Sequence, residues 1–279
     1  MELYRSVSSD VSRLITKRYS TSFSIATMLF GRNIRSHIYN IYGIVRVADE
    51  IVDTYNGKDT AELLDDFENE VEQALPRRYS TNPVIQAFVD TASKFNIGED
   101  LIKPFFNSMR LDTKKKRYNQ KEYEDYIYGS AEVVGLMCLR VFCFGNEDEY
   151  KKLVPGARAL GSAFQKVNFL RDLASDKNSL ERYYFPVGDF IDFDEKTKQQ
   201  IIEDIESDFE LAKDAISQLP TNSRVAVTVA YRYYLELLKK IKDTPASRLK
   251  MDRIRISDPK KISILVVTVL GQPFGRKSL

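Results

Sequence analysis

The chain alternates long stretches, in which apolar residues recur every three or four positions, with short stretches rich in glycine, proline and asparagine. Between Asn33 and Asn56 the apolar residues keep helical spacing, with Gly43 as the one interruption. Residues 59–74 show the same spacing, and we expect Pro76 to end that helix. Further helices are predicted at 83–95, 100–112, 120–145, 157–177, 196–218 and 222–242.

The stretches between these segments carry turn chemistry. They are Gly57–Lys58, residues 77–83, residues 145–147, Pro155–Gly156, and Pro186 with Gly188. The most apolar run, residues 262–271, is shorter than the roughly 20 residues that cross a bilayer. We expect it to be a buried terminal element, with a dip into a membrane as the alternative. Because no linker or shift in composition divides the chain, the pattern predicts one all-α domain over residues 1–279.

Composition narrows the classes of function. Lys and Arg exceed Asp and Glu by 42 − 40 = 2, so no basic surplus favours nucleic-acid binding. Two cysteines and one histidine cannot form a disulfide framework or a histidine-based catalytic cluster, and the cysteine spacing fits no standard zinc site. Residues 1–9 lack the apolar stretch of a secretory signal. We therefore expect a cytoplasmic protein. The basic cluster 114–117 is interpreted as a solvated loop, with attraction to anionic lipid headgroups as the alternative.

Two segments share an acidic pattern. Asp49 and Asp53 are four residues apart, and so are Asp172 and Asp176. On a helix this spacing places both carboxylates on one face, about one turn apart, where their charges repel. A single such pair is typical of a solvated helix face. Here both pairs follow largely apolar segments, which favours a functional role.

The second pair extends a longer polar stripe. Gln165, Asn168, Asp172 and Asp176 are spaced to lie on one face of a helix whose other residues are largely apolar. Burying such a stripe costs free energy unless partners satisfy it. Mg²⁺ is a suitable partner because it takes oxygen ligands and is usually held by a few carboxylates together with substrate phosphates. Two facing acidic helices would hold metal ions around a diphosphate leaving group. The carbocation left behind would need a dry cavity and aromatic faces.

At this point the sequence resembles the squalene/phytoene synthase family of head-to-head isoprenyl diphosphate synthases, and it looks most like the bacterial phytoene synthases. The resemblance is carried in order by residues 19–23, 42–53, 126–137, 165–176 and 181–186. It implies an isoprenoid synthase-type helical bundle around a central apolar cavity.

The resemblance also implies roles for individual residues. The metal ligands would be Asp49, Asp53, Asp172 and Asp176, assisted by Asn168. The substrate diphosphates would be held or flanked by Ser20, Ser22, Arg46, Gln165, Arg171, Arg182 and Arg253. Tyr42, Tyr128 and Tyr234 would face the reacting centre, and Phe23 and Thr27 would contact the substrate chain. If the helix after Phe23 lines the hydrocarbon tunnel, the small Thr27 favours C20 over C15 substrates.

The implied reaction is Mg²⁺-dependent condensation of two geranylgeranyl diphosphates to phytoene through a cyclopropylcarbinyl diphosphate, with Mn²⁺ as an alternative metal and no NADPH. The alternatives are a C15-using dehydrosqualene or squalene synthase, a head-to-tail prenyltransferase or cyclase, and a non-catalytic assembly factor of the same fold. The last two are disfavoured because the chain has two DxxxD pairs in place of a DDxxD motif and keeps all four aspartates. We expect a monomer or weak dimer, no nucleic-acid partner, and peripheral contact with the inner face of the membrane as an option.

Overall fold

The computed structural model describes residues 1–55, 57–114, 117–180, 182–187 and 190–271, without the side chains of residues 21, 22, 114 and 178–180. The longer helices are α1 (Glu2–Tyr19), α3 (Arg32–Asp53), α4 (Thr60–Arg77), α5 (Pro83–Phe95), α6 (Glu99–Lys114), α9 (Glu147–Leu180), α10 (Glu195–Gln218) and α11 (Thr221–Lys242). Shorter ones are α2 (Thr21–Thr27), α7 (Gln120–Ile127), α8 (Val133–Phe142), α12 (Ala246–Leu249) and α13 (Asp258–Leu270). Within the described ranges the sole β pairing is an isolated bridge between Arg117 and Tyr183. The predicted all-α fold is confirmed.

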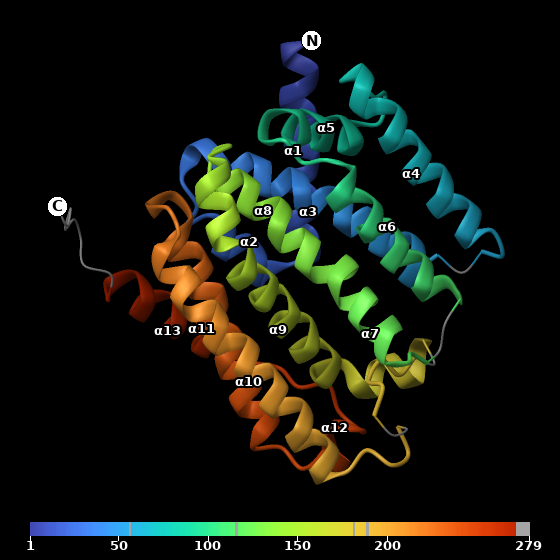
Figure 1. Cartoon of the computed structure of the whole chain (residues 1–279), viewed down its shortest axis with the longest axis vertical. Coiled ribbons are helices and arrows are strands. Elements are labelled where there is room, and N and C mark those ends of the chain that lie inside the picture. The colour runs from blue at the N-terminus through green and yellow to red at the C-terminus, as the bar shows by residue number, and fades with distance from the viewer. Residues whose placement is uncertain (56, 115–116, 181, 188–189, 272–279) are drawn as a thin grey trace.

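Helix α9 lies in the middle of the bundle (Figure 1). It packs against α10 and α11 on one side and against α7 and α8 on the other. Helices α4 and α5 pack together over α3, away from α10. The two acidic segments belong to different helices, α3 and α9.

Several helices begin where their sequence predicts. Asn82 caps α5 by accepting a hydrogen bond from the Val84 N–H, and Pro83 occupies the first turn, where its missing N–H is not needed. Asp194 caps α10 by accepting from the Thr197 N–H. The predicted helices 83–95, 196–218 and 222–242 are thus confirmed to within a residue at each end.

Two prolines were expected to interrupt helices but do not. Helix α4 continues through Pro76 to Arg77 and ends at Arg78, whose φ of 54° is left-handed. The predicted turn at Pro155–Gly156 is also wrong, because both residues lie inside α9. A Cβ at position 156 would lie 2.1 Å from the Cβ of Ala215, so this glycine permits close packing of α9 against α10.

The single helix predicted over 120–145 is three segments. Helix α7 is followed by a π-helical turn, Tyr128–Glu132, and then by α8. A Cβ at Gly129 would lie 2.2 Å from the Pro104 carbonyl oxygen of α6, and one at Gly161 would lie 2.8 Å from the Ala131 carbonyl oxygen. These two glycines let the π-helical turn, a feature found frequently at functional sites, fit tightly between α6 and α9.

The apolar run near the end of the chain forms helix α13, and its expected burial is wrong. Ile262, Val267 and Leu270 are 57%, 60% and 71% exposed. The helix packs on α11, where Arg232 donates to the Thr268 hydroxyl at 3.0 Å and Glu236 pairs with Lys260 at 3.0 Å. Over the described ranges, none of the helices combines the length and the apolar character needed to cross a membrane.

Candidate active site

An apolar cavity of about 380 Å³ lies within the bundle, a size in the usual range for small-molecule pockets. It is lined from several elements, including α2, α3, the π-helical turn, α8, α9, α10 and α11. Small residues are frequent in its wall: Ala26, Ala131, Gly135, Gly156, Ala157, Gly161, Ala215, Ala226 and Ala230. Aromatic rings from five helices and from the segment between α2 and α3 complete it: Phe23, Phe30, Tyr42, Phe142, Phe164 and Tyr234. This wall provides the apolar, ring-lined enclosure expected from the sequence.

Both acidic pairs continue the faces of α3 and α9 that line this cavity. On α3 the lining residues Ile38, Tyr42 and Val45 are followed at helical spacing by Asp49 and Asp53. On α9 the lining residues Gly161, Phe164 and Asn168 are followed in the same way by Asp172 and Asp176. Each helix therefore changes from apolar to acidic along one face, and the carboxylates lie at one end of the apolar wall.

The acidic pair of α3 contains one carboxylate in an ion pair and one with a raised pKa. The Arg182 guanidinium donates to Oδ1 of Asp53 at 2.8 Å. Burial, followed by the negative charge of Asp53, raises the pKa of Asp49 to about 7, although Arg46 opposes the shift. Arg46 itself donates to Glu50 at 2.5 Å and lies 4.4 Å from the centre of the Tyr19 ring. Arg46 and Arg182 thus pair with Glu50 and Asp53, and Asp49 lies between Arg46 and Asp53 along α3.

The acidic pair of α9 likewise contains one carboxylate in an ion pair and one with a raised pKa. Arg171 donates to both oxygens of Asp172, at 3.0 and 2.5 Å, and Arg253 Nε lies 2.6 Å from Asp172 Oδ1. Burial, followed by the negative charges of Asp172 and of Asp53 on the other helix, raises the pKa of Asp176 to about 7. The two helices meet at Arg182, whose backbone N–H donates to the Asp176 carbonyl at 3.0 Å and whose guanidinium donates to Asp53 at 2.8 Å.

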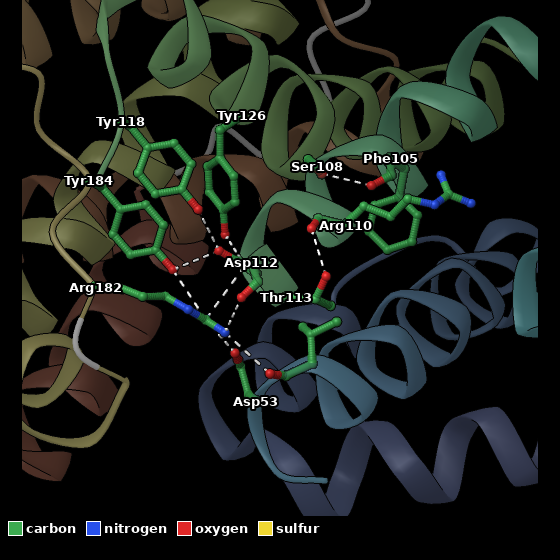
Figure 2. A network of polar contacts seen from close by, with 11 residues as sticks. Asp53, Phe105, Ser108, Arg110, Asp112, Thr113, Tyr118, Tyr126, Arg182 and Tyr184 are labelled. Atoms are coloured by element: carbon green, nitrogen blue, oxygen red, sulfur yellow. Dashed lines mark hydrogen bonds and ion pairs between the residues drawn. The ribbon is translucent and has the colours of Figure 1, made fainter. Parts of the chain in front are cut away.

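A buried polar network is linked to Asp53 through Arg182 (Figure 2). The Asp112 carboxylate on α6 accepts hydrogen bonds from the hydroxyls of Tyr118 at 2.9 Å, Tyr126 at 2.7 Å and Tyr184 at 3.1 Å. Arg182, with 6% of its side chain exposed, lies 3.6 Å from Asp112 Oδ2. Burial raises the pKa of Tyr126 and Tyr184 well above the ordinary value, so these hydroxyls stay neutral donors.

The same network fixes Arg182. Its NH2 group donates to the backbone carbonyls of Val52 at 3.2 Å and Asp112 at 3.0 Å, while NH1 reaches Asp53. The guanidinium is therefore fixed between α3 and α6. No site role was predicted for Asp112, Tyr118, Tyr126 or Tyr184. The available signal was an aspartate on the apolar face of α6, which follows the buried Phe105 and Met109 at helical spacing.

Of the residues in α2 and α3 that were predicted to contact the substrate, some line the cavity and others do not. Phe23 and Tyr42 line the cavity and stack with ring centres 4.7 Å apart. Ser20 caps α2, and its hydroxyl accepts the Phe23 N–H at 3.2 Å. Thr27 is fully buried and donates to the Phe23 carbonyl at 2.7 Å, and the neighbouring Ala26 lines the cavity in its place. The side chain of Ser22 lies outside the described part of the structure, as do Lys115 and Lys116 of the basic cluster.

The remaining predicted residues lie on α9, on α11 and in the π-helical turn. Tyr234 and Asn168 line it, and the tyrosine hydroxyl donates to the Asn168 side-chain oxygen at 3.2 Å. Gln165, one turn before Asn168, is partly exposed. Tyr128 opens the π-helical turn but is not among the lining residues, and its ring centre lies 5.1 Å from the Arg158 guanidinium. The structure thus brings Tyr42 and Tyr234, but not Tyr128, to the cavity wall.

The donor set suits a hard divalent cation. Four carboxylates and the amide of Asn168 offer oxygen ligands. Burial, and after it the neighbouring carboxylates, raise the pKa of Asp49 and Asp176, and a bound cation would stabilise their charged forms. In the part of the chain that the structure describes, no three carboxylate, imidazole or thiol groups form a cluster that could hold a metal ion. This arrangement fits an ion that takes one or two protein carboxylates and completes its coordination with substrate phosphates.

Comparison with known proteins agrees with this geometry. The squalene/phytoene synthase family matches residues 16–260. A phytoene synthase of Arthrospira platensis is 30% identical over 265 residues, which cover 85% of this chain and 84% of that protein. A 4,4'-diapophytoene synthase of Staphylococcus haemolyticus is 24% identical over 268 residues, covering 90% of this chain and 92% of that protein. A dehydrosqualene synthase crystal structure superposes with a TM-score of 0.83 at 21% identity, over 96% of this chain and 97% of that one.

These matches extend over most of the chain and include both acidic pairs. The protein is a helical prenyltransferase with an apolar cavity and paired acidic helices. It belongs to the squalene/phytoene synthase family, whose members act on prenyl diphosphates and generally use a divalent metal.

Proposed function

We propose that the protein condenses two molecules of geranylgeranyl diphosphate head to head to form phytoene, for carotenoid biosynthesis, through a cyclopropylcarbinyl diphosphate. The observation that carries this proposal is the continuity of two helix faces, each of which lines the apolar cavity and ends in an acidic pair. Such a site can hold a charged head and a hydrocarbon tail at the same time. The similarity to the Arthrospira phytoene synthase supports the C20 substrate.

Asp49, Asp53, Asp172 and Asp176, with Asn168, would hold Mg²⁺, which neutralises the diphosphate as it leaves. Arg182 would lie beside that diphosphate, because it is fixed next to Asp53. Tyr42 and Tyr234 would present ring faces and hydroxyls to the developing carbocation. Burial raises the pKa of both hydroxyls, so neither is an anionic nucleophile at neutral pH.

The reaction proceeds in two stages in this one cavity. In the first, the C1–O bond of one substrate breaks, and the double bond of the second attacks C1 with loss of a proton, giving the cyclopropylcarbinyl diphosphate. In the second, that diphosphate departs, the skeleton rearranges, and loss of a proton gives the linear product. No hydride is added, so no NADPH is required. The protein's contribution is to hold both tails against an apolar wall and to exclude water.

The test is incubation of the purified protein with Mg²⁺ and either geranylgeranyl or farnesyl diphosphate, without NADPH, followed by mass analysis of the hydrocarbons. A C40 hydrocarbon is the expected product. The absence of both C40 and C30 hydrocarbons would refute the synthase function. A C30 hydrocarbon alone would support the second candidate, a dehydrosqualene synthase, which is favoured by the similarity to the Staphylococcus diapophytoene synthase.

The cavity wall offers a test of chain length. Because Ala26 lines the cavity and Thr27 does not, Ala26→Phe is expected to fill space that a C20 tail occupies. We expect the ratio of C40 to C30 product to fall about 10-fold, measured with equal concentrations of the two substrates. Met28→Phe adds a ring at an exposed position of the same segment and serves as the matched control. An unchanged ratio in Ala26→Phe would exclude this part of the wall as the determinant of chain length.

A further inference from the structure

A second pocket, of about 280 Å³, lies between α1, the end of α2 and the beginning of α3. Its lining includes one carboxylate, Asp10, and four cations: Arg13, Lys17, Arg32 and Arg35. We call it the basic pocket. None of its residues lines the apolar cavity. Arg35 and Asp53 lie on the same helix, and a rise of about 1.5 Å per residue separates them by roughly 27 Å. The basic pocket is therefore distinct from the acidic pairs.

The cations of the basic pocket are not neutralised by the protein. In the part of the chain that the structure describes, none of the four forms an ion pair with a carboxylate, whereas Arg5, also on α1, pairs with Asp90 at 3.2 Å. Like charges gathered around one pocket repel each other, and solvent and salt screen that repulsion only in part. An anion bound among them would relieve it.

The beginning of α3 adds to the positive charge. A helix N-terminus carries partial positive charge, and it favours capping side chains and acidic residues. Helix α3 has neither, because its N-cap residue is Gly31 and its first turn contains no acid. Arg32 and Arg35 occupy this end instead. The sequence thus places two cations where the helix dipole disfavours them, a local conflict that an anionic ligand would resolve.

Two donor groups of the basic pocket lack acceptors. Tyr39 is 3% exposed and lines the pocket, and its hydroxyl has no hydrogen-bond partner among the described residues. That hydroxyl is not fully enclosed by protein atoms, so it is open to the pocket. The partly buried Arg35 makes one hydrogen bond within the described ranges, from NH2 to the Phe30 carbonyl at 2.9 Å. This bond orients the guanidinium and leaves most of its five N–H donors unused.

We propose that the basic pocket binds a phosphate-bearing anion, at a site separate from that of the proposed reaction. A phosphate group carries at least one negative charge and presents acceptor oxygens in several directions, so it can contact donors on α1 and α3 at once. The ligand is a free phosphate or the headgroup of an acidic phospholipid, which share this chemistry. Because Met28 at the end of α2 also lines the basic pocket, the bound anion would steady α2, whose Phe23 and Ala26 line the apolar cavity.

The first test is calorimetric titration of the protein with inorganic pyrophosphate at low salt, after metal is removed on a chelating resin. Saturable binding is expected in the parent. Tyr39→Phe keeps every charge and removes one donor, so we expect it to weaken binding about 5-fold. Arg35→Gln removes the oriented cation and should weaken binding about 10-fold or more. Arg18→Gln removes the same charge from an exposed residue of α1 outside the pocket and should bind as the parent does.

A second measurement identifies the source of the phosphate. The protein is sedimented with vesicles of phosphatidylcholine, with and without phosphatidylglycerol. Sedimentation that requires phosphatidylglycerol, and that falls in Tyr39→Phe and on addition of pyrophosphate, identifies a lipid headgroup. Binding of pyrophosphate without such sedimentation identifies a free phosphate.

The proposal is overturned if the parent binds neither pyrophosphate nor the acidic vesicles, or if Tyr39→Phe binds them as tightly as the parent. It is also overturned if Arg18→Gln weakens binding as much as Arg35→Gln. Loss of pyrophosphate binding in Arg171→Gln, beside the α9 acidic pair, would overturn it too, because the anion would then occupy the proposed reaction site. Since no prenyl substrate is used, failure here leaves the hydrocarbon assay as an independent test of the proposed function.

Discussion

The acidic pair of α3 and the acidic pair of α9 have the same sequence pattern but different surroundings. In each, one aspartate is ion-paired with arginine and the other has its pKa raised to about 7. In the α3 pair, Asp53 is held by Arg182, which is buried and fixed by backbone carbonyls. In the α9 pair, Asp172 is held by Arg171 and also by Arg253, whose side chain is 44% exposed. Identical spacing thus produces one rigid and one adaptable half of the site, and the difference comes from which distant segments pack behind each helix.

The largest effect is expected where the two pairs are alike. Asp49→Asn and Asp176→Asn each remove a carboxylate with a raised pKa, and each is expected to lower the rate of hydrocarbon formation about 10³-fold or more. The measurement is the initial rate with saturating Mg²⁺, with circular dichroism to confirm folding. Asp125→Asn, at an exposed position on α7, is the control for loss of one negative charge. A loss confined to one of the two site variants would mean that only one helix holds the metal.

The next largest effect is expected in the free energy of unfolding when Arg182 is replaced. Arg182→Gln leaves the buried Asp112 carboxylate without its cation, and we expect the free energy of unfolding to fall by about 3 to 5 kcal/mol. The measurement is urea unfolding of the metal-free protein, followed by circular dichroism. Tyr118→Phe removes only one of the hydroxyls that bond to Asp112 and should cost about 1 kcal/mol. A loss below about 1 kcal/mol in Arg182→Gln would contradict the rigid assignment of the α3 half.

The sequence predicted most helices because their buried faces are apolar, and it missed α1 because that helix buries polar residues. Ser8, Ser12 and Thr16, spaced four apart, are fully buried in α1. A Cβ at Gly43 of α3 would lie 2.8 Å from the Ser12 hydroxyl, so small side chains let the two helices approach. A hydropathy pattern cannot find such a face. It also cannot tell which helix covers another, which is why α13 was wrongly expected to be buried.

The candidate site also contains residues that the sequence pattern predicts and residues that it does not. The four aspartates and Asn168 could be predicted because each lies on a polar stretch of an otherwise apolar helix face, a local signal. The Asp112 network could not, because its tyrosines and Arg182 come from α7, from the segment before it and from the segment after α9. No spacing in the sequence brings those residues together. The counter-ions of the acidic pairs are therefore a property of the tertiary fold.

A smaller effect is expected in the pH dependence of stability. Burial raises the pKa of Asp49 and of Asp176 from the ordinary 3.8 to about 7, so the folded protein binds more protons than the unfolded chain between these two pH values. Stability of the metal-free protein should therefore fall as pH rises through this window. Asp176→Asn, which cannot ionise, should gain roughly 2 to 3 kcal/mol relative to the parent between pH 4 and pH 8, measured by urea unfolding. A constant difference between the two proteins would show that burial does not penalise this carboxylate.

The smallest effect on stability is expected at the adaptable half. Arg253→Gln breaks an ion pair whose arginine is 44% exposed, and Arg171 continues to neutralise Asp172. Solvent screening limits the cost to at most about 1 kcal/mol in the free energy of unfolding. Urea unfolding at low and at 1 M salt gives a second readout, because the small loss should nearly vanish in 1 M salt, where the screening length is about 3 Å. A loss as large as that of Arg182→Gln, or one that salt does not change, would mean that Arg253 is as rigidly bound as Arg182. It would then be a structural cation of the fold.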